Sequence, residues 1–347
     1  MSQRAPAHLA QRPASGAPVG ATSRPHELTT ARASRIGILA GGGRLPLTIA
    51  ESVIEHGGSV HIVAIEGEAD QAIARFPHTW VNWGHVGRMV TTLRRHGGTM
   101  VIAGSVRRPN LWKLRPDLGF LLSLPQILEM MAGGGDDSVL SRVVRFFEAK
   151  GIEVRGAHEV APDLLASAGP AGALALDAGA QADAELGFAV RSALGPLDAG
   201  QAVVVADGKV LAIEGAEGTD PMLARAGSLR DARTGAARSG VLTKGPKPGQ
   251  ELRVDMPAIG PRTVEGVAAA GLAGVVVEAG AVLLLDRGEA VAAADARGIA
   301  IEGLPRTPAL SSLGGSIAPT PAEQLRLEIE RGAHRSVPSP LVGEGQD

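Results

Sequence analysis

Six charged side chains in the C-terminal half of the chain are of the types that phosphate chemistry requires. They are Glu217, Asp220, Lys244, Lys247, Arg253 and Asp255. Lysine and arginine neutralise phosphoryl oxygens, and a carboxylate holds a hydrated Mg²⁺ ion, which usually takes one or two protein carboxylates and completes its shell with water and substrate phosphates. If folding brings the six together, they resemble a polyphosphate site.

Local structure offers simpler interpretations of two parts of this set. Asp220 precedes Pro221, which suits the first position of a helix, so Asp220 is also a candidate N-cap. Residues 251–256 alternate as a strand does, which would place Arg253 and Asp255 on one face, where an ordinary salt bridge explains them equally well. Both interpretations stay open.

A glycine turn near the start of the chain is the second candidate for binding an anion. The apolar strand expected at residues 35–40 runs into Gly41-Gly42-Gly43 and then Leu45-Pro46, before a helix expected at 47–56. Glycines let the backbone approach a ligand closely, and a helix N-terminus attracts an anion. Pro46 replaces the third glycine of the dinucleotide fingerprint, so an ordinary tight turn remains the alternative.

Two further strands are expected to end at the same rim as this turn. Residues 59–65 end at Glu66, which is a suitable position for an acid that meets a ribose hydroxyl, and residues 99–103 lead into a polar turn. That turn holds Ser105, Arg107, Arg108 and Asn110. Because the carboxyl ends of parallel strands share one edge of a sheet, these residues are candidates to hold phosphate or base, although solvated loop charges would look the same.

An apolar segment and a second glycine run follow this turn. Residues 111–131 are rich in Leu and Met, which suits either core packing or a deformable wall for an acyl chain. Gly133-Gly134-Gly135 then opens a helix expected at 138–150, with Asp136 or Asp137 as its N-cap or as a ligand to a metal or sugar.

Composition narrows the possible functions. With 34 basic and 36 acidic residues the chain lacks the positive excess of a nucleic-acid-binding protein, and with no cysteine it has no disulfide, thiolate metal site or cysteine nucleophile. The apolar run at 267–285 is broken by glycines and Glu278, so we expect a helix and two strands there rather than a membrane span.

These patterns predict an α/β fold with two domains. We expect an N-terminal Rossmann-like parallel-sheet domain at 35–165, a linker at 166–180 and a C-terminal catalytic mixed α/β domain at 181–305. An Asp207-Gly208 hairpin near the start of the second domain is a strong local signal. Residues 1–34 and most of 306–347 have the composition of disordered tails, although the first also resembles an organellar transit peptide.

Seven motifs in fixed order add a family resemblance over residues 35–303. They are Gly37-Ile38-Leu39-Ala40-Gly41-Gly42-Gly43-Arg44-Leu45-Pro46, Ala103-Gly104-Ser105-Val106-Arg107-Arg108-Pro109, Gly135-Asp136-Asp137, Gly156-Ala157-His158-Glu159, Glu217-Gly218-Thr219-Asp220, Lys244-Gly245-Pro246-Lys247-Pro248 and Arg253-Val254-Asp255-Met256-Pro257. Together they resemble the LpxI-type UDP-2,3-diacylglucosamine pyrophosphatases of bacterial lipid A synthesis. The resemblance implies that two domains close over UDP-2,3-diacylglucosamine. It also implies Mg²⁺-dependent attack of water on the α-phosphorus, which gives UMP and 2,3-diacylglucosamine 1-phosphate (lipid X).

In the resemblance Asp255 matches the catalytic aspartate. From the charges that a pyrophosphate requires, we expect Asp255 to bind Mg²⁺ or to orient water, with Glu217 and Asp220 as supporting acids at the metal and Lys244, Lys247 and Arg253 on the phosphates. The expected substrate-binding residues are Gly41, Gly42, Gly43, Leu45, Pro46, Glu66, Ser105, Arg107, Asn110, Asp137 and Thr219. The family reading places the protein in the cytoplasm, in transient contact with the cytoplasmic leaflet of the inner membrane, and it leaves a homodimer open.

Two other classes of function compete with hydrolysis. A nicotinamide-dependent oxidoreductase would explain the glycine turn and Glu66, but it is disfavoured by the imperfect glycine fingerprint. A non-catalytic carrier of a nucleotide sugar or lipid would not need Lys244, Lys247 and Asp255.

Overall fold

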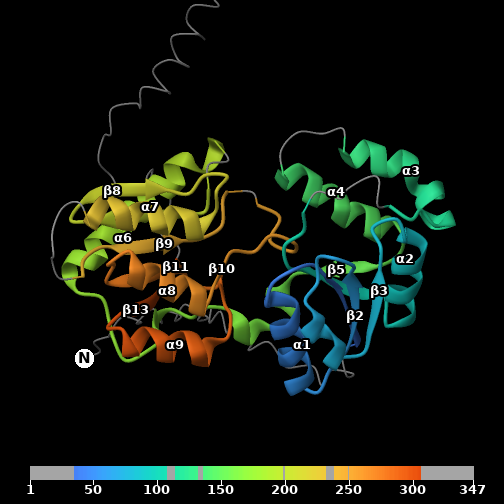
Figure 1. Cartoon of the computed structure of the whole chain (residues 1–347), viewed down its shortest axis with the longest axis horizontal. Helices are drawn as coiled ribbons and strands as arrows, with labels where there is room; N and C mark the ends of the chain where they lie inside the picture. Colours follow the sequence, from blue (N-terminus) through green and yellow to red (C-terminus); the bar gives the residue numbers. More distant parts are fainter. Residues whose placement is uncertain are drawn as a thin grey trace, which may run out of the picture.

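The computed structural model describes residues 35–107, 114–131, 136–197, 200–231, 238–248 and 250–305. Both tails expected from composition, as well as Arg108 and Asn110, lie outside these residues, as do the side chains of Asp136 and Asp137. The described chain forms two lobes side by side, with the N-terminal half in one and the C-terminal half in the other (Figure 1). The α/β fold class, with a parallel N-terminal sheet and a mixed C-terminal sheet, is confirmed.

The N-terminal lobe is built on a five-stranded parallel sheet in the order β3-β2-β1-β4-β5. The strands are β1 (Arg35–Ala40), β2 (Ser59–Ile65), β3 (His78–Val81), β4 (Thr99–Ala103) and β5 (Glu153–Arg155). The helices are α1 (Leu45–Glu55), α2 (Val86–Arg95), α3 (Leu118–Met131), α4 (Asp136–Ala149) and α5 (Ala157–Val160), with a short 3-10 turn at Gln71–Arg75. The strand order reverses at β1, so the crevice between β1 and β4 is where a doubly wound sheet binds its ligand.

The C-terminal lobe is built on a six-stranded mixed sheet in the order β6-β13-β11-β9-β7-β8. The strands are β6 (Gly169–Pro170), β7 (Ala202–Ala206), β8 (Lys209–Ile213), β9 (Val241–Lys244), β11 (Gly274–Glu278) and β13 (Ala300–Leu304). Strands β9, β11 and β13 are parallel, whereas β7 is antiparallel to both β8 and β9. The expected hairpin turn is present, because Asp207 and Gly208 have φ angles of 54° and 72°, as a type I′ turn requires.

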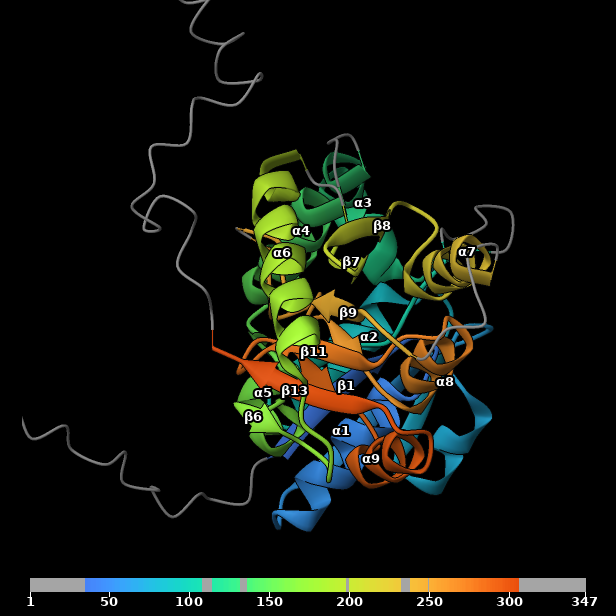
Figure 2. The same cartoon turned by 90° about the vertical axis from the view of Figure 1, so that its left-hand side faces the viewer.

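Helices cover both faces of this second sheet (Figure 2). On one face lies α6 (Ala178–Leu194), and on the other lie α7 (Thr219–Asp231), α8 (Pro261–Ala269) and α9 (Arg287–Ala296). Short 3-10 turns occur at Pro162–Leu164 and Gly195–Leu197. The segment expected to be a linker contributes to this lobe, because β6 pairs with β13 and α6 begins at Ala178.

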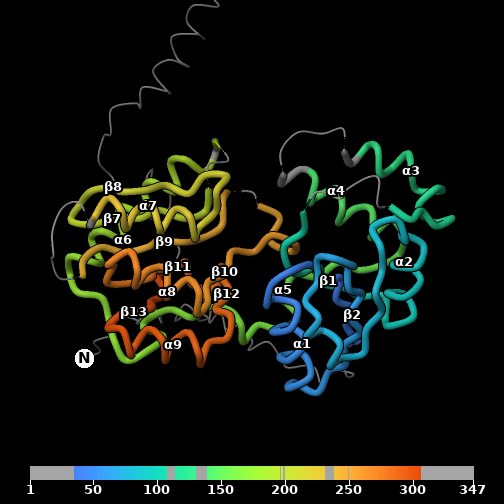
Figure 3. The backbone as a smooth tube through the Cα atoms, viewed as in Figure 1, coloured from blue at the N-terminus to red at the C-terminus, as the bar shows by residue number. Residues whose placement is uncertain are grey.

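A small sheet joins the lobes. Strands β10 (Ala258–Ile259) and β12 (Leu283–Leu284) pair between them, as the backbone trace shows (Figure 3). Leu283 is fully buried in the hydrophobic core of the N-terminal lobe, and Arg44 Nη2 donates to Asp286 Oδ1 across the junction at 2.8 Å. The two lobes are therefore held together by apolar packing as well as by an ion pair.

One element expected from the sequence is wrong. Residues 251–256 form no strand; the backbone turns, with the N–H groups of Val254 and Asp255 donating to the Glu251 carbonyl at 3.2 and 3.1 Å. The alternation of polar and apolar residues has another explanation here: Arg253 forms an ion pair with Glu251, two residues earlier. A charge pair at this spacing imitates the alternation of a strand.

The apolar run near the C-terminus is divided as expected. Helix α8 ends at Ala269, and the two expected strands are β11 and the short β12. Within the parts of the chain that the structure describes, no helix is long and apolar enough to span a membrane.

Candidate active site

The glycine turn after β1 is paired with the turn after β4. The Gly42 N–H donates to the Ser105 carbonyl at 2.7 Å, and the Ser105 N–H donates to the Gly42 carbonyl at 3.0 Å. A Cβ added to Gly41 would lie 2.4 Å from the Ser105 oxygen, so a side chain at this position would force the two turns apart. The glycines therefore bring two loops of the sheet edge together.

A cleft of about 730 Å³ lies between the lobes beside this turn. Its N-terminal wall includes Gly43 and Arg44, and its C-terminal wall includes Thr219, Asp220 and Lys244. The rest of the lining comes from the β10–α8 segment and from residues 285–289. The glycine turn and one cationic end of the C-terminal sheet thus face a single cavity, which is large enough for a nucleotide-sized ligand.

Lys244 is the buried cation of this cleft. It is the last residue of β9, is only 9 % exposed, and its Nζ donates to Thr219 Oγ1 at 2.9 Å. Thr219 Oγ1 in turn donates to Glu214 Oε1 at 2.7 Å. Burial lowers the pKa of Lys244, while the carboxylates of Glu214, Asp220 and Asp255 oppose that shift. An ammonium group is therefore held next to three acids at the cleft wall.

Asp255 lies in the turn that replaces the expected strand. Its Oδ2 accepts hydrogen bonds from Gln250 Nε2 at 2.5 Å and from Gln201 Nε2 at 3.4 Å, and its Oδ1 accepts none from the described residues. This turn reaches the N-terminal lobe, where a Cβ on Gly156 would meet the Arg253 Cα at 3.3 Å (Figure 1). Asp255 is half-buried at the domain junction.

The other cations expected on phosphate have different partners. Arg253 donates to Glu251 Oε1 and Oε2 at 2.8 and 2.7 Å and to Glu148 Oε1 of α4 at 2.8 Å, and these carboxylates raise its pKa. Lys247 does not line the cleft. Its backbone N–H donates to Gln250 Oε1 at 2.9 Å. Arg253 and Asp255 do not pair on one strand face, so Arg253 serves as a link between the domains in this structure.

Glu217 and Asp220, the two acids expected beside Asp255, line the cleft, but each forms an ion pair with an arginine. Glu217 accepts from Arg225 at 2.7 Å, which lowers the pKa of this exposed carboxyl, and Asp220 pairs with Arg262. Glu214, which points at Thr219 and also accepts from the Gln201 N–H at 2.9 Å, is closer to the lysine network than Glu217.

The N-terminal residues expected to bind substrate are only partly brought together. Gly43 lines the cleft, Gly42 and Ser105 hold each other, and the buried Pro46 lies in the first turn of α1, just after Leu45. Glu66 is exposed at the end of β2, where its backbone N–H donates to the Val81 carbonyl at 2.9 Å. Arg107 donates to the Gly67 carbonyl at 3.0 Å and contacts Glu68 at 3.4 Å, away from the cleft lining.

The residues suit a metal that takes few protein ligands. No group of three or more His, Cys, Asp or Glu side chains that could hold a metal occurs among the described residues. Magnesium, however, commonly uses one or two carboxylates together with substrate phosphates and water. Asp255, with one oxygen that accepts no hydrogen bond from the described residues, fits that pattern, whereas a metal cage made by the protein alone does not.

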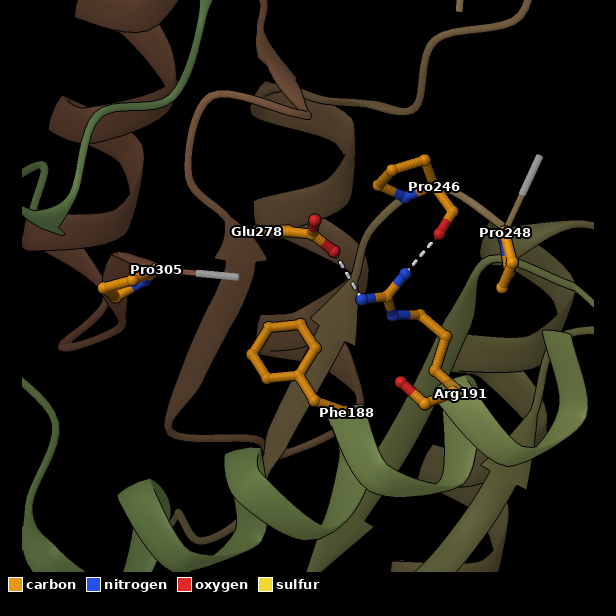
Figure 4. Close-up of a pocket in the computed structure, with 7 residues that line it drawn as sticks. Phe188, Arg191, Pro246, Pro248, Glu278 and Pro305 are labelled. Atoms are coloured by element: carbon orange, nitrogen blue, oxygen red, sulfur yellow. Dashed lines mark hydrogen bonds and ion pairs between the residues drawn. The ribbon is translucent and has the colours of Figure 1, made fainter. Parts of the chain in front are cut away.

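A second, smaller cavity lies beside the loop that follows Lys244. It has a volume of about 40 Å³, and Arg191 of α6 crosses it, donating to Glu278 Oε2 at 2.6 Å and to the Pro246 carbonyl (Figure 4). A Cβ on Gly245 would lie 2.8 Å from Arg191 Cζ, which explains the glycine in this loop. The cavity is large enough for only a few waters. Arg191, which donates to the Pro246 carbonyl, holds the loop at residues 245–248 in place.

We expect Arg191→Met to lower the free energy of unfolding by roughly 3–5 kcal/mol, because it removes one partner of a buried ion pair and leaves the other in a low-dielectric site. Urea unfolding followed by circular dichroism measures this. The exposed Arg297→Met should change stability by less than about 0.5 kcal/mol. Equal midpoints for the two variants would show that the buried pair contributes nothing.

The fold and the site define a two-domain α/β protein with a cleft between a glycine turn and a lysine–carboxylate network. Family models match both halves: the LpxI N-terminal domain at residues 35–164 and the LpxI C-terminal domain at residues 167–302. The chain belongs to the LpxI family. It is similar to the UDP-2,3-diacylglucosamine pyrophosphatase LpxI of Caulobacter vibrioides, with 41 % identity over 273 residues, covering 78 % of this chain and 97 % of that protein.

Proposed function

We propose that this protein hydrolyses the pyrophosphate bond of UDP-2,3-diacylglucosamine to give UMP and 2,3-diacylglucosamine 1-phosphate. The observation that supports this most is the shared cleft, in which the glycine turn of one lobe faces the Lys244–Thr219 end of the other. The similarity to the Caulobacter pyrophosphatase supports the choice of substrate.

The chemistry requires neutralisation of charge and placement of water. A pyrophosphate diester carries two negative charges that repel an attacking hydroxide, so positioning and electrostatics account for most of the catalysis. A water oxygen bonds to the α-phosphorus while the bond from that phosphorus to the bridging oxygen breaks. The bridging oxygen leaves on the sugar phosphate, and the uridine half departs as UMP.

The residues of the cleft suit separate parts of this step. Lys244 offers an ammonium group to the phosphoryl oxygens, with Thr219 and Glu214 fixing its direction. Asp255 does not line the cleft, but its charge acts on Lys244, and we assign it to orient the attacking water or to take its proton. At the glycine turn the N–H groups of Gly41 and Gly42 donate to the Ala103 and Ser105 carbonyls, so we assign the nucleotide phosphate to the N–H groups of Gly43, Arg44 and Leu45 at the start of α1.

Magnesium is part of the proposal. When bound, Mg²⁺ would neutralise phosphate charge and lower the pKa of a coordinated water. Asp255 is the carboxylate we assign to it, with Glu214 and Asp220 as nearby acids that shape the field.

Purified protein incubated with UDP-2,3-diacylglucosamine and Mg²⁺ in ¹⁸O-water tests the reaction. We expect UMP that carries one ¹⁸O atom, and no release of UMP in excess EDTA. Label in the sugar phosphate would place the attack on the β-phosphorus. Binding of the substrate without release of UMP would favour a carrier, and binding of NAD(P)H would reopen the oxidoreductase alternative.

A diacyl substrate resides in a bilayer, and α3 has an exposed apolar surface that suits contact with a bilayer. Leu118, Leu121, Leu122 and Leu128 lie on one face of this helix, and Leu118 and Leu122 are 71 % and 74 % exposed. The N-terminal end of α3 adjoins exposed Arg88, whose backbone N–H donates to Asp117 at 3.0 Å, and exposed Arg115. Leucines beside arginines suit an anionic lipid surface, so we assign the membrane contact to α3.

The double substitution Leu118→Ser, Leu122→Ser should lower binding to phosphatidylethanolamine–phosphatidylglycerol vesicles at least about tenfold, because each leucine contributes ~1.5 kcal/mol or more on leaving water. Vesicle co-sedimentation measures it, and Leu197→Ser, at an exposed leucine of the other lobe, is the matched control. Unchanged binding to vesicles would show that α3 does not contact the membrane. If light scattering shows a wild-type dimer that the double variant dissociates, α3 forms a contact between subunits instead.

A further inference from the structure

Asp255 is held by two side-chain amides of the C-terminal lobe. Gln250 Nε2 and Gln201 Nε2 both donate to Oδ2, at 2.5 and 3.4 Å. Neither glutamine carries charge, and neither the glutamines nor Asp255 line the cleft. The contact through which the glutamines can act on the reaction is their pair of hydrogen bonds to the aspartate.

Gln250 is fixed at both ends of its amide. Its Oε1 accepts the Lys247 N–H at 2.9 Å, which directs the NH₂ group toward Asp255, and the residue is 8 % exposed. Its own backbone N–H donates to the Lys247 carbonyl at 3.2 Å. The orientation of the amide is thus set by the loop that follows Lys244.

Gln201 joins the same two parts of the site from the start of β7. Its carbonyl accepts the Gly245 N–H at 3.1 Å, and its own N–H donates to Glu214 Oε2 at 2.9 Å. Gln201 therefore links Glu214, which accepts from Thr219, to Asp255.

We propose that Gln250, assisted by Gln201, is a positioning residue that holds Asp255 by one oxygen and keeps its Oδ1 directed at the water or metal of the reaction. This rests on the proposed pyrophosphatase activity. Hydrogen bonds of this kind fix a reacting group within the narrow range of positions that catalysis tolerates, and a displacement of about 1 Å costs up to ~10²-fold.

The alternative is that Gln250 only supports its loop, and one substitution separates the two roles. Gln250→Glu keeps an oxygen to accept the Lys247 N–H but replaces the donor to Asp255 by a second carboxylate. Gln250→Leu removes both bonds. If Gln250 only supports the loop, the Glu variant behaves as wild type and the Leu variant does not.

We expect kcat for release of UMP to fall about 10- to 100-fold in both variants, with KM within about threefold of wild type, because the substrate phosphates contact other groups. Gln201→Leu should lower kcat by less, in keeping with its longer bond. Affinity for UMP without metal, measured by calorimetry, should not change in any of them. Gln71→Glu, the same chemical change at an exposed position, is the control.

Wild-type activity must be measured first. Absence of activity in the wild type defeats the proposed function itself, and the glutamine variants then decide nothing about it. With an active wild type, a wild-type kcat in Gln250→Glu defeats the positioning role. A loss in Gln250→Glu that appears only as a raised KM defeats it equally.

Discussion

Replacing Asp255 by asparagine lowers kcat for UMP release by about 10³-fold, the largest effect we expect from any single substitution. Asparagine keeps the shape of the side chain and an oxygen that accepts from Gln250, so the turn at 251–255 stays in place. What is lost is the negative charge to which the proposed function assigns the orientation of water or the binding of a metal. Release of UMP is measured at saturating substrate and Mg²⁺.

The matched control is Asp207→Asn in the β7–β8 turn. Asp207 has a φ of 54°, a left-handed conformation that asparagine adopts as readily as aspartate, so this variant should keep both stability and activity. Thermal unfolding of both variants should match wild type within a few degrees. If Asp255→Asn retained more than about a tenth of wild-type kcat, Asp255 would be removed from the mechanism.

The sequence predicted best those elements whose pattern depends on local burial alone. Strand β2 occupies residues 59–65 as expected because all of its apolar side chains are buried. Strand β3 was missed because only Val81 of its four residues is buried, and the pairing with β2 that defines it is not local. The turn at 251–256 was misassigned because the fold of Arg253 onto Glu251 cannot be told from strand alternation.

The candidate site also divides into residues that the local sequence indicates and residues that only tertiary structure reveals. The sequence alone singles out Lys244 and Asp255 as candidates, because a lysine can neutralise phosphate, a carboxylate can hold Mg²⁺, and Asp255 matches the catalytic aspartate of the family. Gln201 and Gln250 could not be singled out in this way, since an uncharged amide gains meaning only when a specific acceptor lies within hydrogen-bond distance. Glu214 and Glu217 flank the same turn, and only tertiary structure shows that Glu214 meets Thr219 while Glu217 meets Arg225.

Removing the charge of Lys244 is the second substitution with a large expected effect. Lys244→Met should lower kcat/KM by about 10²–10³-fold, because a preorganised cation in a partly dry cleft contributes far more than a solvated one. Glu214, Asp220 and Asp255 would then face the substrate phosphates without the ammonium group that lies among them. The control is Lys209→Met, an exposed lysine of β8, which should keep wild-type kcat/KM.

The pH profile gives an independent test of Lys244. Burial lowers its pKa from the ordinary 10.5, and only the protonated form neutralises phosphate. As pH rises through this lowered pKa the ammonium loses its proton, so wild-type kcat/KM should fall on the alkaline side at a pH below that of an exposed lysine. In Lys244→Met the residual activity should lack this alkaline limb. An unchanged limb in the variant would assign the titration to another group and leave Lys244 without the role of phosphate partner.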